Sequence, residues 1–131
     1  MNPVFLIIGS VFAVLAAVLH VVIFRFESIQ WSTPSVWKRF GMTSQADADV
    51  VRPMAYNQGF YNLFLGVGAA LGVVLLATGV TEAGYAIALF ATGSMLAAAS
   101  VLILSNPKLA RAAITQGTFP LLAVVCLLLQ L

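Results

Sequence analysis

Charged residues are scarce in this chain of 131 residues: six Lys and Arg and four Asp and Glu together make up 8% of it. A soluble domain carries about 25% charged residues, because its surface has to interact well with water. Hydrophobic residues account for 62% of the sequence, and its mean hydropathy is +1.06. This composition excludes a soluble globular domain and predicts an integral membrane protein.

Cysteine and histidine each occur only once, as Cys126 and His20. A single cysteine excludes an intramolecular disulfide and a cysteine metal cluster, so we expect Cys126 to be a packing residue. A single histidine without an HExxH pattern provides too few ligands for a zinc site. The sequence therefore predicts no metal and no cofactor. Its formal charge of +2 predicts membrane lipid as the partner of the basic residues, and no nucleic acid.

Long apolar runs are what the sequence does contain, at roughly 3–24, 55–79, 83–104 and 112–131. Each approaches the roughly 20 residues that a helix needs to cross a hydrocarbon core of about 30 Å. The runs are continuous rather than alternating, which favours helices over barrel strands. We predict an all-α fold, an integral membrane four-helix bundle in a single domain, with spans at about residues 3–26, 53–79, 83–104 and 110–131.

The basic residues are confined to the first and third connections between these runs. Short loops rich in Lys and Arg stay in the cytoplasm, so we expect a multi-pass protein of the plasma membrane with both termini outside the cytoplasm. The first run has no Lys or Arg ahead of it, unlike a secretory signal, and is interpreted as a retained span. The six basic residues are Arg25, Lys38, Arg39, Arg52, Lys108 and Arg111.

The first connection is the only long one, and it is predicted to contain a short helix between Pro34 and Gly41. We expect this helix to lie at the cytoplasmic membrane interface, with Lys38 and Arg39 toward the headgroups. Ser44 can cap a further helix that runs into the second span, which Pro53 would kink or begin. The side chains of the short helix expected to face the membrane are Val36, Trp37 and Phe40.

Polar side chains are rare within the apolar runs, and such side chains usually face the bundle interior and often mark function. At 1.5 Å per residue, His20 lies about 26 Å along its helix from Pro3, near the inner edge of the hydrocarbon. In the second span, Gly68 and Gly72 form a GxxxG pair suited to close packing. Eight polar residues fall in the predicted cytoplasmic half, and the outer half is nearly bare of polar side chains; the eight are His20, Glu27, Asn57, Gln58, Tyr61, Asn62, Ser100 and Gln116.

Helical periodicity assigns most of these residues to two faces. On the second span, Asn62 is expected to share a face with Gln58 and Tyr61. We therefore expect a polar pocket between the first two spans that opens only to the cytoplasm, rather than a route across the membrane. The predicted stripe on the first span consists of Gly9, Ala13, Ala16, His20, Phe24, Glu27 and Trp31.

Two motifs on these faces resemble the domain-of-unknown-function family 1304, whose members are small bacterial membrane proteins. The first motif, H-x-x-I-F-x-x-E-x-x-x-W, runs from His20 to Trp31, and the second, N-Q-G-x-Y-N-x-F-L, runs from Asn57 to Leu65. Phe40-Gly41 between the motifs belongs to the same resemblance, which extends over nearly the whole chain. The resemblance implies a compact four-helix fold in a bacterial inner membrane, and it implies no established activity.

Three functional hypotheses follow. The leading one is a pocket that binds a small amphipathic or hydrophobic molecule or a lipid. The others are an enzyme in which His20 and Glu27 transfer a proton, and a homo-oligomer or accessory subunit that binds other membrane proteins through its small-residue faces. Purely structural roles stay open, such as an ion pair between Glu27 and a basic residue of the first connection. The predicted ligand-binding residues are His20, Glu27, Trp31, Asn57, Gln58, Tyr61, Asn62 and Gln116.

Overall fold

The computed structural model describes residues 2–131, and every regular element in that range is helical. The first long helix, α1 (Pro3–Phe24), continues directly into a π-helical turn, η1 (Arg25–Ile29). A short helix, α2 (Pro34–Trp37), and a 3-10 turn, η2 (Lys38–Phe40), follow in the first connection. A short helical segment is therefore present in this connection, and its place at the membrane interface stays a prediction.

The second half of the fold consists of three long helices joined by short connections. Helix α3 (Gln45–Ala77) is followed by α4 (Thr81–Ser105), a 3-10 turn, η3 (Pro107–Leu109), and α5 (Ala110–Leu129). Together with α1 and η1, these give four helices long and apolar enough to cross a membrane. The predicted all-α class with four apolar spans is confirmed.

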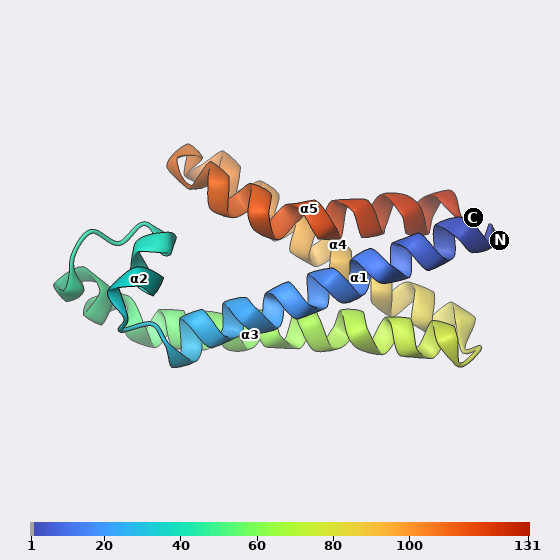
Figure 1. Cartoon of the computed structure of the whole chain (residues 1–131), viewed down its shortest axis with the longest axis horizontal. Helices are drawn as coiled ribbons and strands as arrows, with labels where there is room; N and C mark the ends of the chain where they lie inside the picture. Colours follow the sequence, from blue (N-terminus) through green and yellow to red (C-terminus); the bar gives the residue numbers. More distant parts are fainter. Residues whose placement is uncertain (1) are drawn as a thin grey trace.

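The four long helices form an up-and-down bundle (Figure 1). Helix α1 packs between α3 and α5, and α4 also packs against both of them, while α1 and α4 lie diagonally opposite. Figure 1 shows both termini at one end, with the turn between α3 and α4, and shows α2 and the turn between α4 and α5 at the other end. All the basic residues of the two connections therefore gather at the end that carries α2.

Small side chains form the centre of the bundle, and bulky ones cover its outside. The central cluster contains Ala16 and Ala17 from α1, Ala69 from α3, and Ala91 and Met95 from α4. Large apolar residues such as Phe64, Phe90 and Leu104 are exposed on the outer surface, which is the distribution expected of helices surrounded by lipid. In a membrane, where lipid is as apolar as leucine, small residues let helix backbones approach closely and gain packing contacts.

The predicted small-residue faces do bring the helices together. Gly9, Ala13, Ala16 and His20 are all buried along α1, as their spacing indicated. A Cβ atom added to Gly72 would lie 2.5 Å from the backbone nitrogen of Ala88, and one added to Gly68 would lie 3.4 Å from the Ala91 Cβ. The GxxxG pair therefore packs directly on α4.

The first connection is fixed by local signals that the sequence displays. Gly41 has a φ of 83°, the left-handed conformation that glycine adopts most readily, and it ends η2. The Ser44 hydroxyl accepts a hydrogen bond of 3.1 Å from the Asp47 backbone N–H, so Ser44 caps α3 as predicted. Helix α3 then continues through Pro53 without ending, and extends eight residues on the amino side of the predicted span at 53–79.

The expected orientation of the short helix is wrong for two of its three apolar residues. Val36 and Trp37 are only 6% and 5% exposed, and Trp37 belongs to a cluster with Trp31, Ala48 and Ala55 of this end of the bundle. The physical reason is the need of a buried indole N–H for a hydrogen-bond acceptor. The two indoles find acceptors on α3: Trp31 Nε1 donates to the Ala48 carbonyl at 2.8 Å, and Trp37 Nε1 donates to Gln45 Oε1 at 3.1 Å.

Trp31→Phe should destabilise the protein by about 1 kcal/mol, because the Ala48 carbonyl loses its indole donor while the aromatic packing largely remains. Thermal unfolding in a mild detergent would measure the shift. Tyr61→Phe is a suitable control, since Tyr61 is 55% exposed and the change removes one hydroxyl. Equal melting temperatures for the two variants would contradict a stabilising role for the Trp31 hydrogen bond.

Candidate functional site

The two sequence motifs meet at a direct hydrogen bond between α3 and η1. The Asn62 side-chain N–H donates to Glu27 Oε1 at 2.6 Å, and both residues are more than nine-tenths buried. The same Asn62 nitrogen lies 3.2 Å from the Gln58 carbonyl oxygen of its own helix. Among residues 2–131 no salt bridge is formed, so the partner of Glu27 is the Asn62 amide rather than a basic residue of the first connection.

Glu27 occupies a π-helical turn, which closes over five residues instead of four. The Gln30 N–H bonds the Arg25 carbonyl at 2.9 Å, the i to i−5 bond of this geometry. Such turns are rare and are frequent at functional sites. The next residue, Ser28, donates its hydroxyl to the Tyr56 carbonyl of α3 at 2.7 Å. The turn thus presents two consecutive polar side chains to α3.

No room is left between the motifs for a ligand at this level. A Cβ atom added to Gly59 would overlap the Ser28 hydroxyl, so α3 and η1 are in contact through a glycine. The predicted pocket between the two motifs is therefore wrong in position: Glu27 and Asn62 are brought together, but they contact each other. The sequence pattern identified the two interacting segments correctly and could not give the distance between them.

His20 lies in the same line of contact between α1 with η1 and α3, which we call the seam, and it lies further inside the bundle than Glu27. It is 2% exposed, and its Nδ1 is 2.8 Å from the Ala16 carbonyl of the preceding turn, which fits an Nδ1–H donor and leaves Nε2 as an acceptor. A Cβ atom added to Gly66 would lie 3.6 Å from the His20 Cβ, so the ring belongs to the contact between α1 and α3. His20 and Glu27 share this seam without a hydrogen bond between them among residues 2–131.

Three of the predicted site residues point away from the seam. Asn57, Gln58 and Tyr61 are exposed on α3, which corrects the prediction that the last two share the face of Asn62. The buried positions of α3 are spaced by three and four residues, so the contact face is a narrow stripe. That stripe places Asn57, Gln58 and Tyr61 on its outer flanks; its members in this region are Ala55, Gly59, Asn62, Gly66, Ala69 and Gly72.

Two cavities lie elsewhere. The first, which we call the end cavity, has a volume of about 640 Å³ and lies among the end of α1 with η1, η2, the end of α4, and the segment from η3 into α5. Gln116 lines it, and the other seven predicted ligand-binding residues do not. Its apolar wall consists of Leu19, Val22, Ile23, Phe26, Phe40, Leu102, Leu109 and Ala112, and its polar lining of Lys38, Arg39, Lys108, Arg111, Thr115 and Gln116.

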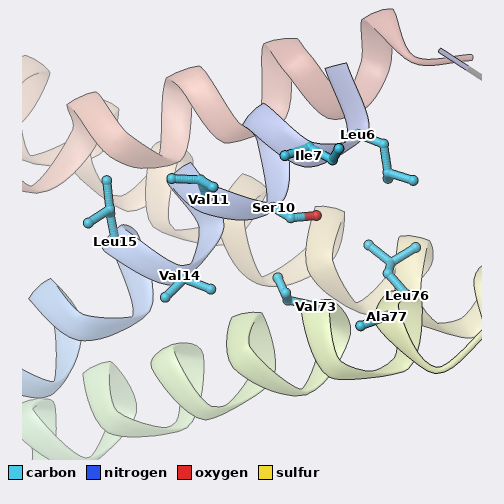
Figure 2. Close-up of a pocket in the computed structure, with 9 residues that line it drawn as sticks. All are labelled: Leu6, Ile7, Ser10, Val11, Val14, Leu15, Val73, Leu76 and Ala77. Atoms are coloured by element: carbon cyan, nitrogen blue, oxygen red, sulfur yellow. The ribbon is translucent and has the colours of Figure 1, made fainter. Parts of the chain in front are cut away.

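The second cavity, the α1–α3 groove, has a volume of about 450 Å³ and lies toward the end of the bundle that carries the termini. Figure 2 shows its lining, which comes from α1 on one side and from α3 on the other. The Ser10 hydroxyl is the one polar side-chain group of the lining, and the remaining side chains are apolar, among them Val14 and Leu76. A groove of this chemistry suits hydrocarbon rather than a polar substrate.

Two positive side chains that line the end cavity lie over aromatic rings. The Lys38 ammonium is 5.7 Å from the centre of the Trp37 ring, and the Arg39 guanidinium is 5.5 Å from the centre of the Phe26 ring. Contacts of this kind contribute roughly 0.5–1 kcal/mol at exposed sites. They hold the two basic groups close to the cavity instead of leaving them fully mobile in water.

The sequence matches the family described as protein of unknown function (DUF1304) over residues 14–128. The chain belongs to this family. The matched region contains both motifs, so in this DUF1304 member the two motifs contact each other between η1 and α3. No curated protein and no solved structure matches the chain.

Proposed function

We propose that this multi-pass protein binds a small amphipathic molecule or a lipid in the end cavity, from the cytoplasmic side of the membrane. The observation that carries the proposal is the division of the cavity lining into an apolar wall and a polar, basic part. Molecules that combine a hydrocarbon portion with a polar head match both parts. The volume of about 640 Å³ falls in the range of about 300–1,000 Å³ typical of small-molecule sites.

The basic residues at this end of the bundle support the proposed cytoplasmic orientation of the cavity. Short basic loops stay on the cytoplasmic side, and the connections that carry them are the ones that line the end cavity. The termini, at the other end, would then lie outside the cytoplasm, as expected for both ends of an even number of spans. A ligand would enter from the cytosol or from the inner leaflet.

Filling the cavity should displace the ligand. Ala112 is half-buried and lines the cavity, so Ala112→Phe is expected to reduce the amount of co-purifying amphiphile at least about fivefold, because the added ring occupies ligand volume. Native mass spectrometry of protein released gently from membranes would measure it. The matched control is Ala98→Phe, which adds the same ring at an exposed position of α4 outside the cavity. Equal ligand loss in the two variants, or no adduct on the unmodified protein, would contradict the proposal.

The two other hypotheses gain less support from the geometry. The small-residue faces, including Gly68 and Gly72, are used within the bundle and are not free to bind another membrane protein. His20 and Glu27 line neither cavity, so a substrate in either of them would not meet the two proposed proton-transfer groups. We therefore place ligand binding first.

A further inference from the structure

The basic residues of the chain are concentrated around the end cavity. Four of the six line it: Lys38 and Arg39 from η2, Lys108 from η3, and Arg111 from α5. The other two, Arg25 and Arg52, are exposed at either side of the first connection, and neither of them lines the end cavity. Orientation in the membrane requires basic loops only, and does not require that side chains from two separate loops converge on one cavity.

No acidic side chain balances these charges. None of the four Asp and Glu residues lines the cavity. Glu27 is held by Asn62 in the seam between η1 and α3. Asp47 and Asp49 accept hydrogen bonds from Thr43 and Gln45 at the start of α3. Because like charges that share one cavity repel, a bound anion would lower the electrostatic energy of this end of the bundle.

The chemistry of the basic groups favours a phosphate. The two arginines carry planar guanidinium groups whose parallel N–H donors match two oxygens of one phosphate, and lysine adds a point charge. The Arg39 guanidinium carbon lies 5.5 Å from the centre of the Phe26 ring, and among residues 2–131 its N–H donors make no hydrogen bond to the protein. Donors from η2 and from the η3–α5 segment can therefore approach one anion from two sides.

The apolar wall continues from the basic groups along α1 toward the middle of the bundle. Leu19, Val22 and Ile23 contribute to it from α1, and Leu102 contributes from α4. Gln116 lies five residues after Arg111 on α5, which is about 7.5 Å deeper along the helix. Its amide N–H could donate to an ester carbonyl at the depth where the glycerol backbone of a lipid would lie.

We propose that the end cavity takes a net-anionic amphiphile whose head carries a phosphate group, with the phosphate between the two basic segments and the hydrocarbon chain along α1. This inference rests on the proposed function and specifies the class of ligand. The head chemistry is shared by an anionic phospholipid and by free phosphate. A phospholipid of the inner leaflet also supplies the chain that the apolar wall fits.

Binding of defined ligands to the full chain in a neutral detergent tests the proposal. Dioctanoyl phosphatidylglycerol is expected to bind about tenfold more tightly than dioctanoyl phosphatidylcholine, which has the same chains and no net charge. The double variant Lys108→Gln/Arg111→Gln should lose this preference, because its affinity for phosphatidylglycerol falls to the level of its affinity for phosphatidylcholine. The matched control is Arg25→Gln/Arg52→Gln, which removes the same charge at this end of the bundle outside the cavity, and it should keep the preference.

Each outcome separates the two proposals. Equal affinity for the two lipids, or an equal loss in both double variants, would overturn the anion-specific site and leave amphiphile binding intact. Binding of neither lipid would overturn the proposed function itself. Inorganic phosphate that binds as tightly as phosphatidylglycerol would overturn the amphipathic ligand, because the hydrocarbon chain would then add no affinity. Thermal unfolding of both double variants checks that these exposed substitutions leave the fold intact.

Discussion

Asn62→Leu should destabilise the folded protein by about 2–3 kcal/mol, one of the two largest effects that we expect from a single substitution. The side chain of Glu27 is 7% exposed, and Asn62 donates to its Oε1 at 2.6 Å. Leucine has the same branched arrangement of side-chain heavy atoms but removes that donor, so a buried carboxyl oxygen loses its hydrogen bond. Reversible unfolding in mixed micelles, with increasing fractions of a denaturing detergent, would measure the loss.

A double-mutant cycle isolates the contact from the volume change. Glu27→Leu/Asn62→Leu replaces both polar groups by apolar ones, so its loss of stability should be smaller than the sum of the two single losses by about 1–3 kcal/mol. Glu27→Gln keeps an acceptor for the Asn62 amide and should cost less than Glu27→Leu. Additive single losses would mean that the contact contributes nothing beyond packing.

The same variants distinguish the two roles proposed for polar residues in this fold. Glu27 and Asn62 join α3 to η1 and line neither cavity, whereas Arg111 lines the end cavity. A stability loss from Asn62→Leu, with the bound amphiphile retained in the fraction that stays folded, is the expected combination. Substitution of Arg111 should instead lower the affinity for the ligand and leave the free energy of unfolding unchanged.

Features that depend on neighbours in the sequence were predictable. The buried stripe on α1, the cap at Ser44 and the glycine end of η2 all follow from spacing or from single-residue preferences within a few positions. The four apolar runs likewise needed only length and hydropathy. For the contact between the two motifs, the sequence pattern predicted that they lie at the same depth. It did not predict how closely they approach, because that distance depends on Gly59 and on the π-helical turn.

The end cavity was not predictable, because it depends on residues that are distant in the sequence. Its lining joins η2 to the start of α5, and no periodic pattern connects the two segments. Helical periodicity also could not decide which residue lies at the middle of the buried face of α3. Gln58 and Tyr61 are within about 100° of Asn62 on a helical wheel, and only the packed neighbours decide that Asn62 is inside. In the sequence, Lys108 and Arg111 therefore indicated only the orientation of the protein in the membrane. The location of the end cavity could be found only in the structure.

Gly72→Ala should destabilise the bundle by about 3 kcal/mol, although alanine is the better helix former. The added Cβ would lie 2.5 Å from the Ala88 nitrogen and 2.7 Å from its Cα, and these backbone atoms cannot rotate away as a side chain could. Helices α3 and α4 would have to separate, and the separation would also disturb the packing of Ala69 and Ala91 in the central cluster.

Gly93→Ala in α4 is the matched control, since a Cβ there would meet nothing within 4 Å. It should leave stability unchanged or raise it by up to about 1 kcal/mol, because alanine reduces the entropy lost on forming a helix. The two substitutions are chemically identical, so a difference in sign would be due to helix separation alone. Equal effects of Gly72→Ala and Gly93→Ala on unfolding would contradict a close approach of α3 and α4 through Gly72.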